Sequence, residues 1–381
     1  MASKHYVDVA LPVPLGQSFT YRVPASMSVL RGGRVLCELG RRKVVGIVLG
    51  PSRAPDVAED KIKPLTAQID QEPVLPEELL GFLQALAEYY FAPVGEVIRL
   101  ALPAIERDTV QRLEQQGVLS LGEAPARQVG GRLQTYARPT DALEEPGSQR
   151  GKAKAVLALL RSDGEQQVAQ LTKRYGNARQ ALKKLVSLGL VTVERRREER
   201  ESLFDGPVAP DEPPTLTDAQ RDAVAAIAEP LEAARAAAFL LFGVTGSGKT
   251  EVYMQAISRC LAADRGALVL VPEIALTPQV VGRFRARFGD RVAVLHSALA
   301  EADRHTMGRQ IKRGELKVVV GARSALFAPV TDLALVIVDE EHDGSFKQEE
   351  GVRYHARHMA LLRAHRAGAG AVPGSWTPAL E

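Results

Sequence analysis

Short apolar runs broken by turn residues open the chain. The stretches "HYVDVALPVP", "FTYRVPA", "GGRVLCELG" and "KVVGIVLG" are rich in β-branched residues and punctuated by Gly and Pro, which predicts a small β-rich unit. It closes with "EELLGFLQALAEYYFAPVGEVIRLALP", where apolar residues recur at three- and four-residue spacing and predict helix. We therefore expect a first domain over about residues 1–105.

A polar stretch with several Gly and Pro residues follows, and it predicts a linker over residues 106–150. Residues 151–204 then show amphipathic periodicity, which predicts an initial helix, a second over Val168–Tyr175 and a third over Asn177–Leu188. A strand is expected over Leu190–Glu194, after a stop at Gly189. Three helices followed by a strand are typical of a winged helix.

Positive charge concentrates in this middle part of the chain. Residues 127–200 contain 16 Lys and Arg against 8 Asp and Glu, whereas the whole chain has a net charge of +3. Lys183 and Lys184 lie on the third predicted helix and Arg195–Arg197 at the wing, which favours contact with DNA phosphates. A solvated basic face and a winged helix that contacts only proteins remain alternatives.

A second Pro-rich linker is expected over residues 205–214, and the pattern changes after it. Over residues 215–381 apolar runs alternate with amphipathic helices, which indicates an α/β fold with a parallel sheet covered on both faces. The expected strands are "AAFLLFGV", "GALVLVP", "VAVLH", "LKVVVGA", "LALVIVDE" and "GAVPGS".

The first of these strands leads directly into "GVTGSGKT", which fits the P-loop pattern in its required strand-to-helix context. Backbone N–H groups of such a loop surround phosphate, and the helix N-terminus adds partial positive charge. We expect Lys249 to contact the β- and γ-phosphates and Thr250 to bind Mg²⁺. The expected ATP-binding residues of the loop are Gly243, Thr245, Gly246, Ser247, Gly248, Lys249 and Thr250.

The strand in "LALVIVDEEH" ends in carboxylates at the edge of the sheet where ligands bind in such folds. We expect Asp339 to hold Mg²⁺ and Glu340 to orient the attacking water. An acidic N-cap for the following helix is the alternative.

The composition excludes several classes of protein. No apolar run approaches the length of a membrane-spanning helix, and the N-terminus lacks the layout of a signal peptide, so we expect a cytoplasmic protein without a membrane partner. The chain has only two cysteines, Cys37 and Cys260, which argues against a disulfide framework and a cysteine-ligated zinc site.

The motifs of the last block resemble helicase superfamily 2, and the sequence is similar to the bacterial replication-restart helicases of the PriA type. "LTDAQRDAV" resembles the family's adenine-sensing motif, with Gln220 as the reader, and "VPEIALTPQ" and "GARSALFAP" resemble its DNA-contact motifs, the latter with Arg323. "DEEHDGSFKQEEGVRYHARHMA" resembles motif II and the aromatic-rich loop that links DNA binding to ATP turnover. The resemblance implies DNA contacts for Phe346, Lys347, Arg353, Tyr354 and His355, in which aromatic rings would stack on bases and cations would meet phosphate.

The first block also fits this family. "VDVALPVPLGQSFTYRVP" and "GGRVLCELGRRKVVGIV" resemble its N-terminal domain, which recognises the 3′ end of a nascent leading strand at a stalled fork. The resemblance implies pocket roles for Phe19, Gly40 and Lys63, but Thr20 stands where the family usually has an acid. The expected fold is therefore a RecA-like parallel-sheet P-loop ATPase lobe preceded by a β-rich DNA-binding domain and a winged helix.

The last residues, "PGSWTPALE", resemble the third helicase motif, with Trp376 in place of a small residue and Pro373 interrupting the expected strand. In the family a cysteine-rich zinc-binding insertion and a second RecA-like lobe follow, so we expect a chain that is truncated there and lacks the zinc ligands.

Two functions remain open. The family implies an ATP-dependent 3′-to-5′ DNA helicase of replication restart, whose partners are forked or single-stranded DNA, primosome proteins and single-stranded-DNA-binding protein. The alternative is a remnant that binds fork DNA and ATP without unwinding. A P-loop signalling or transport ATPase is disfavoured because it would not explain the winged helix, the basic segment and the aromatic-rich loop together.

Overall fold

The computed structural model describes residues 5–52, 58, 61–102, 132–140, 151–176, 178–198, 210–244, 246–297 and 299–377. They belong to two compact units. One unit combines the described residues up to 102 with those from 210 onward, and the other contains the described residues from 132 to 198.

The N-terminal region of the first unit forms a five-stranded antiparallel sheet in the order β2-β1-β4-β3-β5. Val9 and Cys37 are fully buried in its core. This confirms the predicted β-rich unit. The strands are β1 (His5–Ala10), β2 (Phe19–Val23), β3 (Arg34–Leu39), β4 (Arg42–Pro51) and β5 (Ala67–Gln68).

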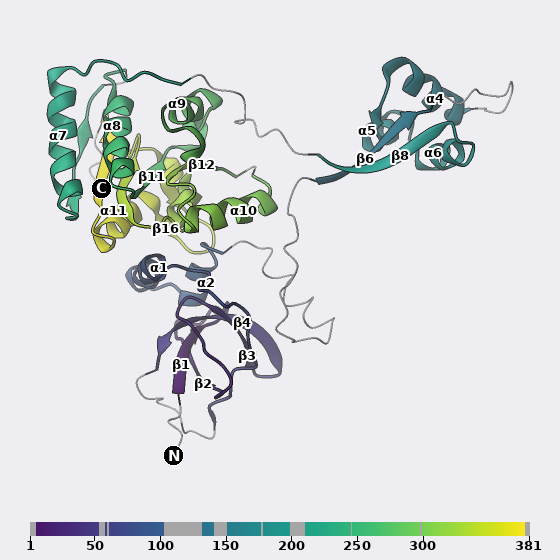
Figure 1. Ribbon diagram of the computed structural model, residues 1–381. Helices are drawn as coiled ribbons and strands as arrows, with labels where there is room; N and C mark the ends of the chain where they lie inside the picture. Colours follow the sequence, from purple (N-terminus) through teal and green to yellow (C-terminus); the bar gives the residue numbers. More distant parts are fainter. Residues whose placement is uncertain are drawn as a thin grey trace. The chain divides into compact units, whose positions relative to one another are not determined.

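Two helices follow the sheet, α1 (Glu77–Tyr89) and α2 (Val94–Ile98). The predicted helical stretch is thus divided, because Phe91 has a left-handed backbone (φ 50°) and Pro93 precedes α2. Apolar side chains of both helices belong to the same core cluster as the C-terminal lobe. Figure 1 shows α1 and α2 between the N-terminal sheet and that lobe.

A buried arginine fastens α1 to the lobe. Arg363 lies on α11 (Ala356–Arg366), is fully buried and donates hydrogen bonds to the carbonyls of Leu326 and Ala328. Its guanidinium also lies 3.4 Å from the Glu78 carboxylate on α1. The N-terminal region and the lobe therefore share one core.

The lobe is built on a parallel sheet in the order β10-β17-β14-β11-β13-β12, with β9 also paired to β17. Every residue of β11, β12, β13 and β14 is buried, as predicted for a sheet covered on both faces. The strands are β9 (Ala237–Ala238), β10 (Leu241–Phe242), β11 (Gly266–Leu270), β12 (Val292–Leu295), β13 (Val318–Gly321), β14 (Leu333–Val338) and β17 (Gly370–Ser375).

Four further helices of the lobe are α7 (Asp218–Glu232), α8 (Lys249–Ala262), α9 (Pro278–Phe288) and α10 (Glu301–Lys312). Short 3₁₀ turns span Glu273–Ala275, Gly289–Arg291, Arg323–Phe327 and Gly344–Phe346, and β15 (Lys347–Gln348) pairs with β16 (Tyr354–His355).

The prediction that Pro373 interrupts the last strand is wrong. β17 continues through Pro373, which lies opposite Val338 of β14. On the other side, β9 pairs with Gly370 and Ala371 and β10 pairs with Gly374 and Ser375. Proline has no backbone N–H to donate. Because neither β9 nor β10 pairs with Pro373, no hydrogen bond between these strands is lost at that position.

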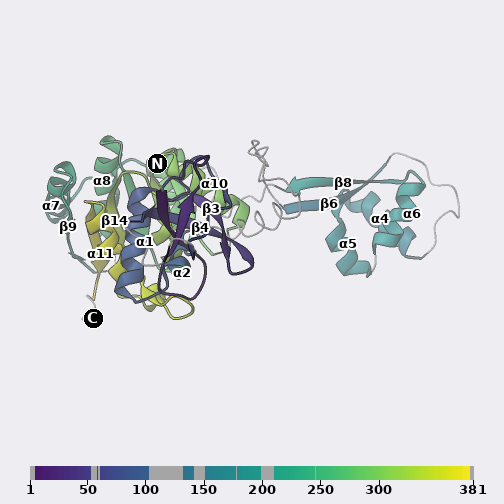
Figure 2. The ribbon, with the colours of Figure 1, turned by 90° about the horizontal axis from the view of Figure 1, so that it is seen from below.

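The second unit contains the predicted three helices followed by a strand (α4, α5, α6 and β8; Figure 2), and in addition β6 before α4 and β7 between α4 and α5. Its three helices pack around a core that includes Val156, Leu160 and Leu185. The bounds of its elements are α4 (Lys152–Asp163), α5 (Val168–Tyr175), α6 (Ala178–Ser187), β6 (Arg132–Pro139), β7 (Gln166–Gln167) and β8 (Val191–Glu198).

The linker predicted over residues 106–150 is wrong in its central part. Residues Arg132–Pro139 form β6, which pairs with β8 from Arg132 opposite Glu198 to Pro139 opposite Val191. The sequence of β6 is polar and has little alternation, so its strand character depends on a partner more than 50 residues away. The rest of this predicted linker, residues 106–131 and 141–150, lies outside the described residues.

Candidate functional site

The P-loop lies between the end of β10 and the start of α8, as the sequence predicted. Gly246 and Gly248 have positive φ angles of 81° and 86°, a backbone that favours glycine. Gly248 is the N-cap of α8, so the loop leads directly into a helix N-terminus. Thr245 lies outside the described residues.

Lys249 reaches back across the loop. Its Nζ donates a hydrogen bond of 2.8 Å to the Gly243 carbonyl and lies 3.8 Å from Glu340 Oε1. Only 9% of its side chain is exposed. The cation is therefore held in place between the P-loop and the carboxylates that follow β14.

Asp339 follows β14 directly, and its backbone N–H bonds to the Leu270 carbonyl of β11. Its Oδ1 accepts a hydrogen bond of 3.1 Å from the Tyr253 hydroxyl. Burial raises the pKa of Asp339 above its usual value, which the Tyr253 hydrogen bond opposes, and burial also raises the pKa of the Tyr253 hydroxyl. Glu340 adopts a left-handed backbone with φ 46°.

Sequence reasoning missed Tyr253. A signal existed, because Tyr253 is four residues after Lys249 on α8 and therefore lies on the same face of that helix.

Both motifs line one cavity of about 530 Å³. The P-loop contributes Gly246, Gly248, Lys249 and Thr250, and the end of β14 contributes Asp339 and Glu340. The structure therefore brings together side chains that lie about 90 positions apart in the sequence.

Arg287 also lines this cavity and was not predicted. Its guanidinium bonds to Asp211 at 2.6 and 2.9 Å and to Glu251 at 2.9 and 3.0 Å, and the Glu251 hydrogen bonds raise its pKa most. Asp211 precedes α7, and its backbone N–H bonds to the Ala286 carbonyl of α9. These contacts attach the segment that enters the lobe to the wall of the cavity.

Gln220 forms a capping box with Thr217 at the start of α7. Its Nε2 also donates a hydrogen bond of 3.1 Å to the Ser247 carbonyl in the P-loop. Gln220 thus contacts the P-loop.

The end of β17 contacts the end of β14. Ser375 is fully buried, and its hydroxyl lies 2.9 Å from His342 Nδ1. The Trp376 ring, which is half-exposed, meets the edge of the His342 ring at a centroid distance of 6.0 Å. The third predicted motif therefore lies beside the second.

The expectation that Phe346 and Tyr354 stack on bases does not fit this arrangement. Phe346 is fully buried, and Tyr354 is buried against Phe327 at a ring distance of 5.4 Å. Base stacking needs an exposed ring face, and neither ring has one here.

Charged groups of the same loop remain accessible. Lys347 and Arg353 are exposed, and the backbone N–H of the half-buried His355 bonds to the Tyr90 hydroxyl. Arg323 donates hydrogen bonds to the carbonyls of Ser345 and Lys347. Arg323 thus fixes the backbone of this loop.

In the N-terminal sheet the structure joins two of the predicted pocket residues. Lys63 Nζ donates a hydrogen bond of 2.7 Å to the Gly40 carbonyl, in the turn between β3 and β4. Phe19 begins β2 and is half-buried. Beside it, the Thr20 hydroxyl donates a hydrogen bond of 2.8 Å to the Asp8 carboxylate of β1. Sequence reasoning missed Asp8.

In the winged helix, Lys183 and Lys184 are exposed on α6. Arg195–Arg197 lie in β8, but their side chains are outside the described residues. Among the described residues there is no group of three or more His, Cys, Asp or Glu side chains able to hold a metal, and no helix long and apolar enough to cross a membrane.

Comparisons with known proteins follow the same division of the chain. A family model of the PriA 3′ DNA-binding domain matches residues 8–103, and a model of the DEAD/DEAH box helicases matches residues 217–372. The helicase family implies ATP and Mg²⁺, and the DNA-binding domain implies contact with DNA.

Individual relatives extend this similarity along nearly the whole chain. It is 33% identical to replication restart protein PriA of Bacillus subtilis (strain 168), over 96% of this chain and 52% of the relative. It is 35% identical to replication restart protein PriA of Chlamydia pneumoniae, over 99% of this chain and 49% of the relative.

A solved structure of RecG bound to a three-way DNA junction is 25% identical with a TM-score of 0.33, and the match covers 44% of this chain and 22% of that one. The family assignment therefore rests on the sequence matches. The chain spans about half the length of the curated relatives it matches, and it belongs to the family of replication restart protein PriA.

Proposed function

We propose that this chain binds ATP with Mg²⁺ in the 530 Å³ cavity and uses the nucleotide to act on forked or single-stranded DNA, as the motor lobe and DNA-recognition part of a 3′-to-5′ replication-restart helicase. The observation that carries the proposal is the convergence of Lys249, Thr250, Asp339 and Glu340 on that one cavity. This combination of a cation, a hydroxyl and two carboxylates at a helix N-terminus suits a nucleoside triphosphate.

Each side chain has a role in this proposal. Lys249 holds its ammonium against the β- and γ-phosphates, and the N–H groups at the start of α8 bind phosphate oxygens. Glu340 Oε2 is buried and, among the described residues, has no hydrogen-bond partner. It can therefore accept a proton from the attacking water and orient it.

The side chains present also fit Mg²⁺. Thr250 and Asp339 line the same cavity and offer the oxygen ligands that this ion prefers. Bound Mg²⁺ would neutralise charge on the phosphates. Tyr253, through its hydrogen bond, fixes the orientation of the Asp339 carboxylate that would hold the ion.

The chain's DNA contacts would come from three places. In the lobe we propose that DNA is contacted by Arg323, Lys347, Arg353 and His355. Phe346 and Tyr354 would support the same loop from the core. In the winged helix we propose Lys183 and Lys184, and in the N-terminal sheet Phe19, Gly40 and Lys63. Support comes from the exposure of the lysines and Arg353 and from the family match of residues 8–103.

ATP hydrolysis by the purified chain, measured with and without forked DNA, tests this function. We expect turnover that forked DNA stimulates, because Arg323 joins the proposed DNA-contact loop to the lobe that holds the nucleotide. Binding of both ATP and forked DNA without any turnover would contradict the motor assignment and favour a protein that only recognises the fork.

We further propose that Asp8 takes the place of the acid that the family has beside its pocket phenylalanine. Its carboxylate lies on the strand next to β2 and accepts the Thr20 hydroxyl. We expect Asp8→Asn to weaken binding of a fork with a 3′-hydroxyl leading-strand end by about tenfold, the order lost with a charged hydrogen bond.

Fluorescence anisotropy with labelled forks measures this effect. The control is the same fork with a 3′-phosphate, for which Asp8→Asn should not weaken binding, since the carboxylate repels that end. An equal loss of affinity for both forks would show that Asp8 acts only on the fold of the sheet.

The family likeness also supports primosome proteins and single-stranded-DNA-binding protein as partners, and a DNA substrate supports a cytoplasmic location. Zinc is not part of this proposal.

A further inference from the structure

Phe91 lies in the turn between α1 and α2, and two of its features do not serve the stability of the fold. Its side chain is 96% exposed, more than any other bulky apolar side chain among the described residues. Its backbone is left-handed, with φ 50°. Glycine usually takes this conformation after a helix, because a side chain there is strained. The other non-glycine residues described with this backbone are small or polar, namely Ala234, Asp264, Asp332 and Glu340. A strained and exposed ring points to a function.

The turn holds this ring in a defined position. The Phe91 N–H bonds to the Glu88 carbonyl at 3.2 Å, and the Ala92 N–H bonds to the Ala87 carbonyl at 2.9 Å. These two hydrogen bonds form a Schellman motif, which ends α1. The hydroxyl of the neighbouring Tyr90 bonds to the backbone of β16. The backbone that carries the ring is therefore fixed both to α1 and to the lobe.

Exposed cations lie next to this turn. Tyr90, the residue before Phe91, lines a cavity of about 460 Å³ together with Lys347 and Arg353. Both cations are exposed. Lys347 pairs with the exposed Glu349 at 3.4 Å, whereas Arg353 forms no ion pair within the part of the chain that the structure describes. The turn thus places an exposed ring one residue away from a cavity with accessible positive charge.

We propose that Phe91 stacks on an unpaired base of a single-stranded nucleic acid whose phosphates contact Arg353 and Lys347. Rings that stack on bases, beside cations that meet phosphates, are the usual combination in proteins that bind single strands. Because the ring is almost fully exposed, a base can reach it without displacing protein side chains. The proposal rests on the proposed action on DNA, and it adds a contact outside the predicted 3′-end pocket of the N-terminal sheet.

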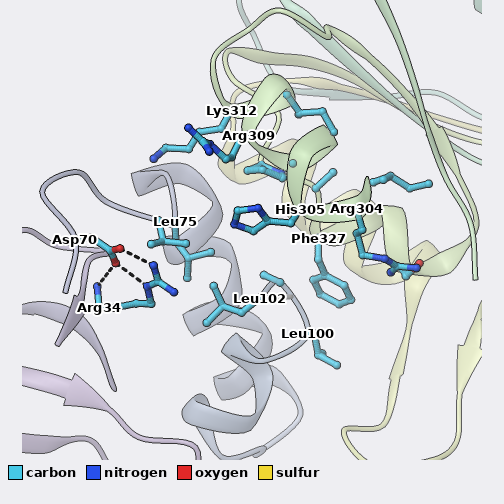
Figure 3. Close-up of a pocket in the computed structure, with 18 of the residues that line it drawn as sticks. Arg34, Asp70, Leu75, Leu100, Leu102, Arg304, His305, Arg309, Lys312 and Phe327 are labelled. Carbon is cyan, nitrogen blue, oxygen red and sulfur yellow. Dashed lines mark hydrogen bonds and ion pairs between the residues drawn. The ribbon is translucent and has the colours of Figure 1, made fainter. Parts of the chain in front are cut away.

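Other rings of this unit are less suitable. Phe346 and Tyr354, which the sequence predicted to stack on bases, are buried. A larger cavity of about 670 Å³ is lined in large part by leucines and by side chains of α10 (Figure 3). The phenylalanine in its lining, Phe327, is buried against Phe82. Stacking needs an exposed ring face, which favours Phe91.

Phe91→Gly separates binding from folding. Glycine adopts the left-handed backbone without strain, but it also makes the unfolded chain more flexible, and these effects oppose each other. The melting temperature should therefore stay within about 2 °C of the wild-type value. Affinity for fluorescein-labelled oligothymidine, measured by fluorescence anisotropy, should fall by about tenfold, as expected for the loss of one stacked base.

Two further comparisons identify stacking as the cause. An abasic strand of the same length keeps its phosphates, so Phe91→Gly and the wild type should bind it equally. Phe91→Trp should keep full oligothymidine affinity, whereas Phe91→Leu should lose as much as Phe91→Gly because leucine has no ring face. The slope of log affinity against log salt should not change in Phe91→Gly, but it should decrease by about 0.7 in Arg353→Ala, which removes one phosphate contact.

The matched control is Phe242→Leu on β10. Phe242 is also exposed, at 66%, but it does not line the 460 Å³ cavity. Its replacement should change oligothymidine affinity by less than about twofold.

Three results would overturn the stacking role of Phe91. They are wild-type oligothymidine affinity in Phe91→Gly, an equal loss of affinity for the abasic strand, and full affinity in Phe91→Leu, which would favour an apolar contact with a partner protein. If forked DNA still stimulates ATP turnover of the wild type, only the stacking fails. A wild-type chain that binds neither oligothymidine nor forked DNA would instead contradict the proposed action on DNA itself.

Discussion

Replacing Lys249 by alanine should reduce ATP turnover by a factor of about 10² or more, as expected when a fixed cation is removed from a transferring phosphoryl group. Its side chain is almost fully buried, and its Nζ lies between the Gly243 carbonyl and Glu340. Shortening this side chain to alanine also leaves the Glu340 carboxylate without its nearby cation. Anionic phosphates would then face uncompensated negative charge. Nucleotide affinity should therefore fall by about tenfold to a hundredfold.

Titration with a fluorescent ATP analogue and a steady-state hydrolysis assay measure the two effects. Arg259→Ala is the matched control, because Arg259 lies on the same helix as Lys249 but is exposed in its last turn and pairs with Glu232. It should leave both quantities unchanged. Wild-type nucleotide affinity in Lys249→Ala would place the phosphates outside the P-loop.

A second large effect is expected from Gly95→Ala, on stability. Gly95 lies in α2, and a Cβ there would overlap the carbonyl oxygen and carbon of Leu11 and lie 3.2 Å from the Pro12 nitrogen. These are backbone atoms, so no side chain can rotate to make room. We expect a loss of about 3 kcal/mol, the upper part of the usual range for overpacked sites.

Thermal unfolding of the chain measures this loss, and the melting temperature should fall by roughly 6–12 °C. Gly16→Ala is the control, since a Cβ at Gly16 would meet nothing within 4 Å. It should shift stability by less than about 0.5 kcal/mol. A melting temperature of Gly95→Ala equal to that of the control would show that α2 does not pack against the end of β1.

Arg287 and Asp211 attach a further segment of the chain to the nucleotide cavity, and the two sequence motifs alone do not predict this attachment. The segment that enters the lobe is attached to the cavity wall through the Asp211–Arg287–Glu251 contacts. Glu251 immediately follows Thr250, the proposed Mg²⁺ ligand. The segment that enters the lobe is therefore fixed beside the proposed Mg²⁺ ligand.

Local patterns were sufficient for the P-loop, for the carboxylates after β14 and for the three helices of the winged-helix unit. In each case the signal lies in a short stretch of sequence, because phosphate binding needs consecutive N–H groups and a helix needs apolar residues at near spacing. The strands β11 to β14 were equally clear, since a sheet buried on both faces demands continuous apolar runs.

These local patterns could not predict contacts between segments that are distant in the sequence. β6 is a strand because β8 pairs with it, and Pro373 is tolerated in β17 because β9 and β10 pair with the residues on either side of it. Phe346 looked like an exposed stacking residue, but tertiary packing buries it in the lobe. Hydrogen bonds to other elements position three residues that the sequence analysis missed, namely Asp8, Tyr253 and Arg287.

The sequence by itself determined that this chain carries a P-loop lobe, a winged helix and a β-rich N-terminal domain, because these elements follow from local spacing and composition. The likeness to PriA came from the resemblance of its motifs. Only the tertiary structure decided that α1 and α2 belong to the core of the lobe, that Lys249 meets Glu340, and that a leucine-rich cavity lies beside the cations of α10. The physical reason is that burial and ion pairing depend on which surfaces meet in space.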